Sequence, residues 1–244
     1  MKISYSHLVS QIKENPSIEM ISESLFQLGH EHEIDGDILN MEFTPNRGDC
    51  LSVNGLLRDL SVFYNVNFKG KIYSEKIDKL QLDFENLSQN ACPKISFLRI
   101  EIDKIPKEYN QYLNDYFMKL HLNKNNFFTD ISNYLSYETG QPTHCYDATK
   151  INGKLVLQEL GINQEFHTLL DKKITLSDKN SVFSINDEVV NLAGVVGGKS
   201  TACTLETKTV LVECAFFEPE AIIGKSLKYD IQSEASHKFE RFVD

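Results

Sequence analysis

Residues 130–147 (DISNYLSYETGQPTHCYD) constrain the fold more than any other part of this 244-residue chain. A Gly-Gln-Pro tripeptide at 140–142 interrupts the stretch. Because glycine accepts positive φ and proline fixes φ near −65°, the tripeptide predicts a rigid turn. Four polar side chains suited to binding or chemistry gather around this turn: Asn133, Gln141, His144 and Asp147.

The stretch also divides two kinds of pattern. Before it, apolar spacing predicts helices near 18–28, 53–65 and 109–120, and strands at 2–5, 38–43 and 97–102. Ser17 is expected to cap the first helix and Asp49 the second, which would bury Phe63. After it, short strands are expected at 154–159, 174–176, 181–185, 189–192 and 209–213, followed by helical spacing over 218–244.

These patterns predict an α+β chain of two domains. A small α-rich N-terminal domain is expected over 1–69, and the polar stretch 70–90 is expected to be a linker or a connecting strand. A mixed α/β domain with a β-sandwich-like core is expected over 91–244. Hydrophobic residues make up 41% of the chain and charged residues 25%, which is a globular rather than a disordered balance.

Charge and cysteine usage exclude several functions. The net charge is −10, so the chain has no overall basic surface for nucleic acid, and any RNA contact must be local. The five cysteines are odd in number and form no C-x-x-C pair, which argues against a disulfide framework and a zinc site. The N-terminus shows no long apolar run, so neither a signal peptide nor a membrane span is expected.

A glycine-rich stretch at 193–200 (AGVVGGKS) partly matches a phosphate-binding loop. Such a loop needs a strand before it and a helix after it, so that backbone N–H groups face the phosphates. Residues 201–207 are β-branched and carry no helical stripe, and Ala193 replaces the first glycine. The favoured interpretation is a glycine-rich turn where backbone passes close to another group.

Glu213 stands inside an apolar strand, where an unpaired carboxylate is costly to bury. Two interpretations stay open. The carboxylate either caps a helix or pairs with a nearby cation, or it is the polar anchor of an aromatic-lined pocket.

Several motifs together resemble the β subunit of bacterial phenylalanyl-tRNA synthetase, and they occur in that family's order over nearly the whole chain. They are 1–6 (MKISYS), 43–53 (FTPNRGDCLSV), 92–93 (CP), 133–134 (NY), 140–147 (GQPTHCYD), 193–198 (AGVVGG), 211–217 (LVECAFF) and 234–244 (EASHKFERFVD).

The resemblance implies that 91–244 is an editing domain, which hydrolyses tyrosine wrongly esterified to the phenylalanine tRNA. It implies catalytic roles for His144 and Asn133, with the backbone N–H groups around Gly197 facing the oxyanion. It also implies a substrate-binding set made of Glu213, Gly197, Ser233 and Ala235. Two positions depart from the family: Ser233 replaces threonine, and Phe242 replaces a glycine.

The resemblance further implies the partners. These are the acceptor end of tRNA(Phe) and the synthetase α subunit, in an α2β2 heterotetramer in the cytoplasm. The chain lacks the RNA-binding insert that many members carry between Ile34 and Phe43. It ends before the regions that use ATP and Mg²⁺, so no cofactor or metal is expected in this portion. The alternative function is a non-catalytic scaffold that supports the α subunit or binds a partner.

Overall fold

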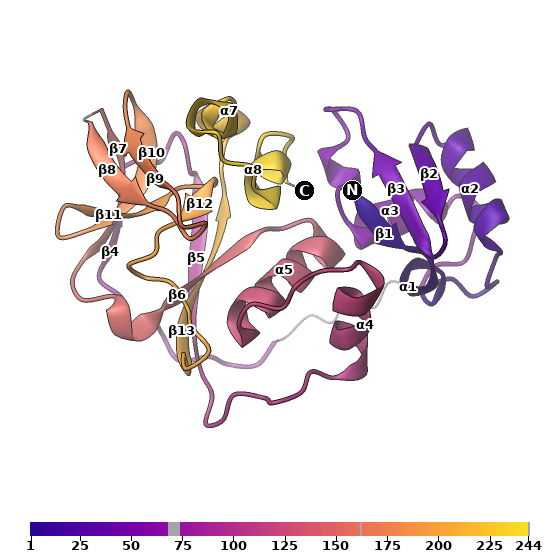
Figure 1. Ribbon diagram of the computed structural model, residues 1–244, viewed down its shortest axis with the longest axis horizontal. Coiled ribbons are helices and arrows are strands. Elements are labelled where there is room, and N and C mark those ends of the chain that lie inside the picture. Colours follow the sequence, from indigo (N-terminus) through magenta and orange to yellow (C-terminus); the bar gives the residue numbers. More distant parts are fainter. Residues whose placement is uncertain (68–73, 162, 244) are drawn as a thin grey trace.

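The computed structural model describes residues 1–67, 74–161 and 163–243, so the domain boundary expected at 69–70 lies outside the described residues. The first unit combines three helices, a 3₁₀ turn and a three-stranded antiparallel sheet of order β1-β3-β2 (Figure 1). Its elements are β1 (Lys2–Ser4), α1 (Tyr5–Val9), α2 (Ile18–Gln27), β2 (Glu31–Asp35), β3 (Ile38–Glu42), η1 (Gly48–Cys50) and α3 (Val53–Leu60). The sequence patterns do not predict β2, so the unit is mixed rather than α-rich.

The helix caps of this unit test two predictions. Ser17 caps α2 by accepting a hydrogen bond from the Met20 N–H, which confirms the first. The expectation that Asp49 caps α3 is wrong, because Ser52 accepts from the Gly55 N–H at 2.9 Å. Asp49 is instead held in an ion pair with its neighbour Arg47. α3 ends at Leu60, and Phe63 is 43% exposed rather than buried.

The second unit contains the remaining strands in three sheets, with orders β12-β11-β10-β7-β4, β5-β13-β6 and β8-β9. Its elements are β4 (Phe84–Asn86), β5 (Lys94–Glu101), α4 (Gln111–Lys119), α5 (Phe127–Thr139), β6 (Thr143–Asp147), η2 (Ala148–Lys150), β7 (Leu155–Leu160), β8 (Gln164–His167), β9 (Lys173–Leu176), β10 (Asn180–Ile185), β11 (Glu188–Leu192), β12 (Val196–Gly197), β13 (Thr209–Phe216), α6 (Pro219–Ile222), α7 (Lys225–Tyr229) and α8 (Glu234–Phe239). The α+β class is as expected. β4 lies within the expected linker and pairs in parallel with β7, so part of that stretch is a connecting strand.

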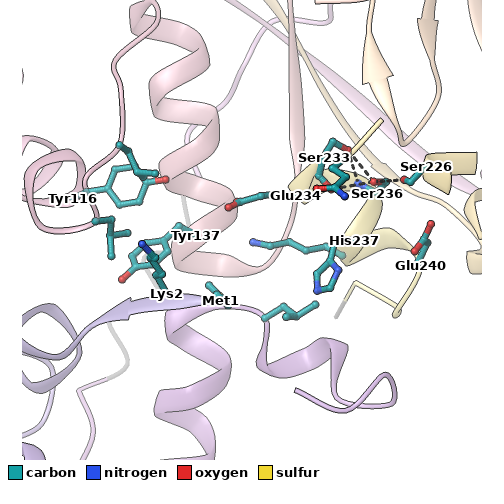
Figure 2. A pocket seen from close by; sticks show the side chains of 15 residues that line it. Met1, Lys2, Tyr116, Tyr137, Ser226, Ser233, Glu234, Ser236, His237 and Glu240 are labelled. Atoms are coloured by element: carbon teal, nitrogen blue, oxygen red, sulfur yellow. Dashed lines mark hydrogen bonds between the residues drawn. The ribbon is translucent and has the colours of Figure 1, made fainter. Parts of the chain in front are cut away.

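The buried clusters divide the chain differently from the expected domains. The first cluster contains apolar residues of the N-terminal unit together with Leu113 and Phe117 of α4 and Tyr137 of α5. α4 and α5 therefore pack against the N-terminal unit although they follow residue 91. A cavity of about 540 Å³ lies where this cluster meets α8, and Tyr116, Tyr137, Ser233 and His237 are among its lining residues (Figure 2).

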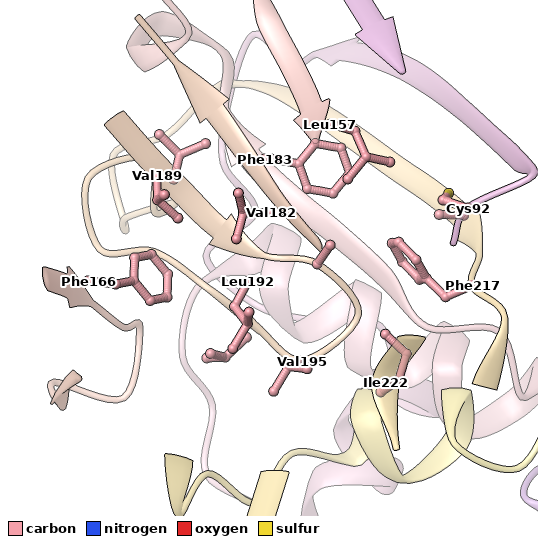
Figure 3. Packing of buried hydrophobic residues seen from close by; sticks show 14 of the residues in the cluster. Cys92, Leu157, Phe166, Val182, Phe183, Val189, Leu192, Val195, Phe217 and Ile222 are labelled. Atoms are coloured by element: carbon pink, nitrogen blue, oxygen red, sulfur yellow. The ribbon is translucent and has the colours of Figure 1, made fainter. Parts of the chain in front are cut away.

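The second cluster is shared by the five-stranded and three-stranded sheets. Leu157 and Phe183 come from the five-stranded sheet, and Tyr146 and Leu211 come from the three-stranded sheet. Phe217 and Ile222 extend the cluster toward the C-terminal helices (Figure 3). The strand that carries Glu213 therefore has one face against the largest apolar core of the chain.

The expected turn at 140–142 ends α5. Gly140 adopts φ +85° at the C-terminal cap of the helix, where its N–H donates to the Ser136 carbonyl. A left-handed residue in this position is a common helix stop, and glycine adopts it without a steric penalty. The turn directs the chain into β6, which places Thr143 and His144 at the start of that strand.

The C-terminal segment packs tightly on the N-terminal unit. A Cβ built on Gly48 would lie 2.0 Å from the Arg241 carbonyl oxygen and 2.6 Å from the Phe242 carbonyl oxygen. Phe242 itself has φ +65°. This left-handed conformation favours glycine, which is the residue that the resemblance implies for this position.

Replacing Gly48 with alanine is expected to destabilise the chain by roughly 1–3 kcal/mol, because backbone atoms must move to admit the methyl group. Chemical denaturation measures the change. Gly161→Ala is the matched control, since a Cβ there would meet nothing within 4 Å. Equal free energies of unfolding for the two variants would show that the backbone at residues 241–242 moves to admit the methyl group without loss of stability.

Candidate functional site

The candidate site is built on the antiparallel pairing of β6 with β13. Glu213 lies opposite His144 in this register, and Leu211 lies opposite Tyr146. Since side chains two positions apart share one face of a strand, Glu213, His144 and Tyr146 point to the same side of the sheet. Directly opposed Cβ atoms in such a pair lie about 4.5–5.5 Å apart. The fold therefore brings together a carboxyl and an imidazole from distant parts of the sequence.

Glu213 is only 4% exposed and belongs to a buried chain of hydrogen bonds. Tyr146 Oη donates to Glu213 Oε2 at 2.6 Å, and Asn191 Nδ2 donates to Tyr146 Oη at 2.7 Å. Burial raises the pKa of Glu213 to about 7, although the Tyr146 hydrogen bond acts in the opposite direction. The first interpretation of Glu213, as a helix cap or the partner of a cation, does not describe this arrangement, because its carboxylate accepts a hydrogen bond from a tyrosine hydroxyl.

His144 is the neutral member of the pair at pH 7. Burial lowers its pKa to about 4, because the charged imidazolium would lose hydration. Its ring packs edge-on to Tyr146 with the centroids 4.4 Å apart. The buried Nε2 atom has no hydrogen-bond partner in the described structure. An unpaired buried nitrogen is costly, so this atom is poised to bind a polar group of a ligand.

Gly197 in β12 lies against the His144 ring. A Cβ at this position would lie 2.2 Å from His144 Cε1 and 2.8 Å from Nε2, so only glycine fits here. The neighbouring N–H groups are already engaged: Gly198 donates to the Val190 carbonyl and Lys199 to the His167 carbonyl. These two groups are thus not free to bind an oxyanion, contrary to the expectation for the backbone around Gly197.

Asn133 and His144 are not joined by any hydrogen bond among the described residues. Asn133 lies on the exposed side of α5. Its neighbour Ser132 faces β6 instead and donates to the Thr143 carbonyl at 2.7 Å. Asn133 therefore stands apart from the Glu213–His144 pair in this conformation.

Ser233 and Ala235 are connected to the site through other residues, by a hydrogen bond and by apolar packing respectively. Ser233 caps α8, and its hydroxyl donates to the Val195 carbonyl at 2.7 Å, two residues before Gly197. Ser233 also lines the cavity in Figure 2, beside Glu234 and Ser236. Ala235 packs against the larger apolar cluster. The serine hydroxyl thus holds α8 to the segment that precedes Gly197.

Comparison with known proteins identifies the family. The family described as the B3/4 domain matches residues 91–244, which is most of the chain and includes the whole candidate site. The chain belongs to the B3/4 domain family. The family resemblance noted in the sequence motifs is confirmed, because the curated relatives are phenylalanine–tRNA ligase beta subunits.

Two of these relatives come from Wolbachia and Ehrlichia. The protein of Wolbachia sp. subsp. Brugia malayi is 29% identical over 97% of this chain and 31% of its own length. The protein of Ehrlichia canis is 33% identical over 85% of this chain and 26% of its own length. The chain thus spans about a third or less of the relatives it matches. A solved N-terminal fragment of the Pyrococcus horikoshii phenylalanyl-tRNA synthetase beta subunit is 13% identical, with a TM-score of 0.45 over 88% of this chain and 67% of that fragment.

The glycine-rich stretch of the B3/4 domain is not a phosphate-binding loop. After β12 the chain forms turns through residue 202, and no helix follows Ser200 before β13. Lys199 forms an exposed ion pair with Asp171. The expected turn interpretation is confirmed, and the group that the backbone approaches is the His144 ring.

Tyr146 and Asn191 are the site residues that sequence reasoning missed. Alternation along β6 carries a signal for Tyr146, since it lies two positions after His144. Asn191 has no such signal, because its place depends on how β11 packs against the other sheet.

Two further structural facts concern the described residues only. Within the described residues of the B3/4 domain, no three histidine, cysteine, aspartate or glutamate side chains meet closely enough to hold a metal; the one such group lies in the N-terminal unit. Every described helix is too short or too polar to span a bilayer.

Proposed function

We propose that this chain is the editing portion of a phenylalanine–tRNA ligase beta subunit and hydrolyses tyrosine esterified to tRNA(Phe). The observation that carries the proposal is the cross-strand pair of buried Glu213 and half-buried His144, whose Nε2 atom is itself buried and has no hydrogen-bond partner among the described residues. A carboxyl that accepts hydrogen bonds from hydroxyl groups, beside an imidazole nitrogen that has no partner, suits a substrate with a phenol at one end and an ester at the other.

Glu213 is proposed to recognise the phenol. A hydrophobic pocket alone separates tyrosine from phenylalanine poorly, whereas a buried acceptor is left unpaired by phenylalanine. The role is supported by the Tyr146 hydroxyl, a phenol of the protein itself, which donates to Oε2. We propose that the substrate phenol donates to Oε1, for which the described residues provide no donor.

His144 is proposed to orient the attacking water or the ester rather than to take the proton. An efficient general base has a pKa near the working pH, and about 4 is too low for an enzyme acting near neutrality. The neutral ring can still hold water at Nε2. Water would attack the ester carbonyl, and the 3′-terminal oxygen of the tRNA would leave with a proton. A neighbouring hydroxyl of the same ribose can assist that proton transfer. Asn133 would contact the ester only after α5 or the substrate moves.

The proposed partners are the acceptor end of tRNA(Phe) and the α subunit of an α2β2 synthetase. The net charge of −10 means that few lysines and arginines are available to neutralise phosphates, so the chain is expected to need the rest of the synthetase for tight tRNA binding. No cofactor is invoked in the proposed hydrolysis.

The test is deacylation of tRNA(Phe) charged with tyrosine or with phenylalanine, by the 244-residue chain and by a complete synthetase containing it. Faster release of tyrosine than of phenylalanine is expected. His144→Ala is expected to slow tyrosine release about tenfold, the worth of one oriented hydrogen bond, with little change in tyrosine discrimination. If neither form deacylates Tyr-tRNA(Phe), the scaffold alternative replaces the proposal.

A further inference from the structure

Three side chains of different chemistry converge in the N-terminal unit, away from the B3/4 site. His30 follows α2, Cys50 ends η1, and Asp59 lies in the last turn of α3. Their ligand-type atoms all lie within 4.8 Å of one another, and His30 and Cys50 are buried. No other group of three such residues is found among the described residues.

The triangle formed by these atoms has the size of a metal coordination face. The distance from His30 Nε2 to Asp59 Oδ2 is 2.9 Å, from Cys50 Sγ to Asp59 Oδ2 it is 3.5 Å, and from Cys50 Sγ to His30 Nε2 it is 4.0 Å. Tetrahedral zinc with its usual bond lengths holds such ligand atoms about 3.3–3.6 Å apart. Each observed distance is thus within roughly half an ångström of the value that zinc requires.

A cationic group already touches this triangle. Arg47 Nη2 donates to Cys50 Sγ at 2.7 Å and to Asp59 Oδ2 at 2.5 Å. Asp49 binds the same guanidinium, accepting from Nε at 3.0 Å and from Nη2 at 3.1 Å, and its carboxylate also lies 3.6 Å from Cys50 Sγ. The Arg47 side chain is 30% exposed, so solvent reaches the guanidinium that a metal ion would have to displace. The site therefore already holds a positive charge against two of the three ligand atoms, Cys50 Sγ and Asp59 Oδ2.

We propose that His30, Cys50 and Asp59 form a binding site for a divalent transition metal ion of the zinc class, which displaces the Arg47 guanidinium. An imidazole, a thiolate and a carboxylate together suit zinc better than magnesium or calcium, which prefer oxygen ligands alone. On binding, the Cys50 thiol releases its proton to solvent, and water or Asp49 takes the fourth position. The proposal does not depend on the function proposed for the B3/4 domain.

The test uses the 244-residue chain freed of metal by a chelator and titrated with Zn²⁺ against a chromophoric competitor. Co²⁺ provides the second readout, because tetrahedral thiolate ligation gives it a distinctive visible absorption. One equivalent of Zn²⁺ is expected to bind. Cys50→Ser and His30→Ala are each expected to weaken binding by at least about 10- to 100-fold, the range found even for outer-shell partners.

Two further variants make the outcome decisive. Cys145→Ser is the matched control, since Cys145 is a thiol of the other unit and is expected to leave binding unchanged. Arg47→Ala is expected to strengthen Zn²⁺ binding, because it removes the competing cation but no ligand. Because Arg47→Ala keeps all three proposed ligands, this variant still tests the site if Cys50→Ser does not fold. Absence of binding at micromolar Zn²⁺, loss of binding in Cys145→Ser, or weaker binding in Arg47→Ala would each overturn the proposal.

Discussion

Replacing Glu213 with alanine is expected to lower the rate of Tyr-tRNA(Phe) deacylation about 5- to 150-fold while leaving the slow hydrolysis of Phe-tRNA(Phe) unchanged. The factor corresponds to the roughly 1–3 kcal/mol that a buried hydrogen bond to a charged or polar anchor contributes. Only the tyrosyl substrate carries the phenol that this anchor recognises, so the loss is selective. The measurement is kcat/KM for both charged tRNAs with each protein.

The control for this variant is Glu188→Ala, which removes an exposed glutamate from β11 and is expected to change neither rate. Equal losses for both substrates in Glu213→Ala would give Glu213 a structural role through Tyr146, whose hydroxyl then has no acceptor. Tyr146→Phe separates these possibilities, because it removes the protein's own donor to Glu213 and keeps the anchor. This variant is expected to retain the preference for the tyrosyl substrate.

Local signals in the sequence predicted the pieces of this fold better than their arrangement. The Ser17 cap and the Gly140 stop act within one turn of chain, so they can be read from neighbouring residues. The helix at α5 was missed although Asn126 caps it, because its interior carries serine, asparagine and threonine, which have weak helix propensity. The strand β2 (EHEID) was missed because its charged sequence becomes a strand only by pairing with β3.

In the candidate site, too, the sequence indicated individual residues but not their arrangement. Glycine at 197 and the carboxyl at 213 were visible as unusual residues in their local sequence. Their meeting with His144 depends on the register of β6 against β13 and on the position of β12, which no local pattern encodes. The grouping of His30, Cys50 and Asp59 was hidden for the same reason. Cysteine spacing indicated no zinc site, because it detects only ligands that are close in the sequence.

Replacing Glu213 with glutamine is expected to remove a pH-dependent loss of stability. Burial raises the pKa of Glu213 from 4.5 to about 7 in the folded chain. Below pH 4.5 the carboxyl is protonated in both the folded and the unfolded state and costs nothing. As pH rises toward 7 the unfolded chain ionises first, so the folded state loses stability by about 3 kcal/mol. Glutamine has nearly the same shape but no charge, and its carbonyl can accept from Tyr146.

The quantity to measure is the free energy of unfolding of Glu213→Gln minus that of the parent chain, from urea denaturation between pH 4.5 and 8. This difference is expected to rise by about 3 kcal/mol across the interval. His144 contributes with the opposite sign: because burial lowers its pKa from 6.5 to about 4, it stabilises the folded chain as pH rises from 4 to 6.5. That contribution is present in both proteins and cancels in the difference. A difference that stays flat with pH would mean that Glu213 ionises in the folded chain as easily as in water, and the buried anchor proposed for the phenol would have no physical basis.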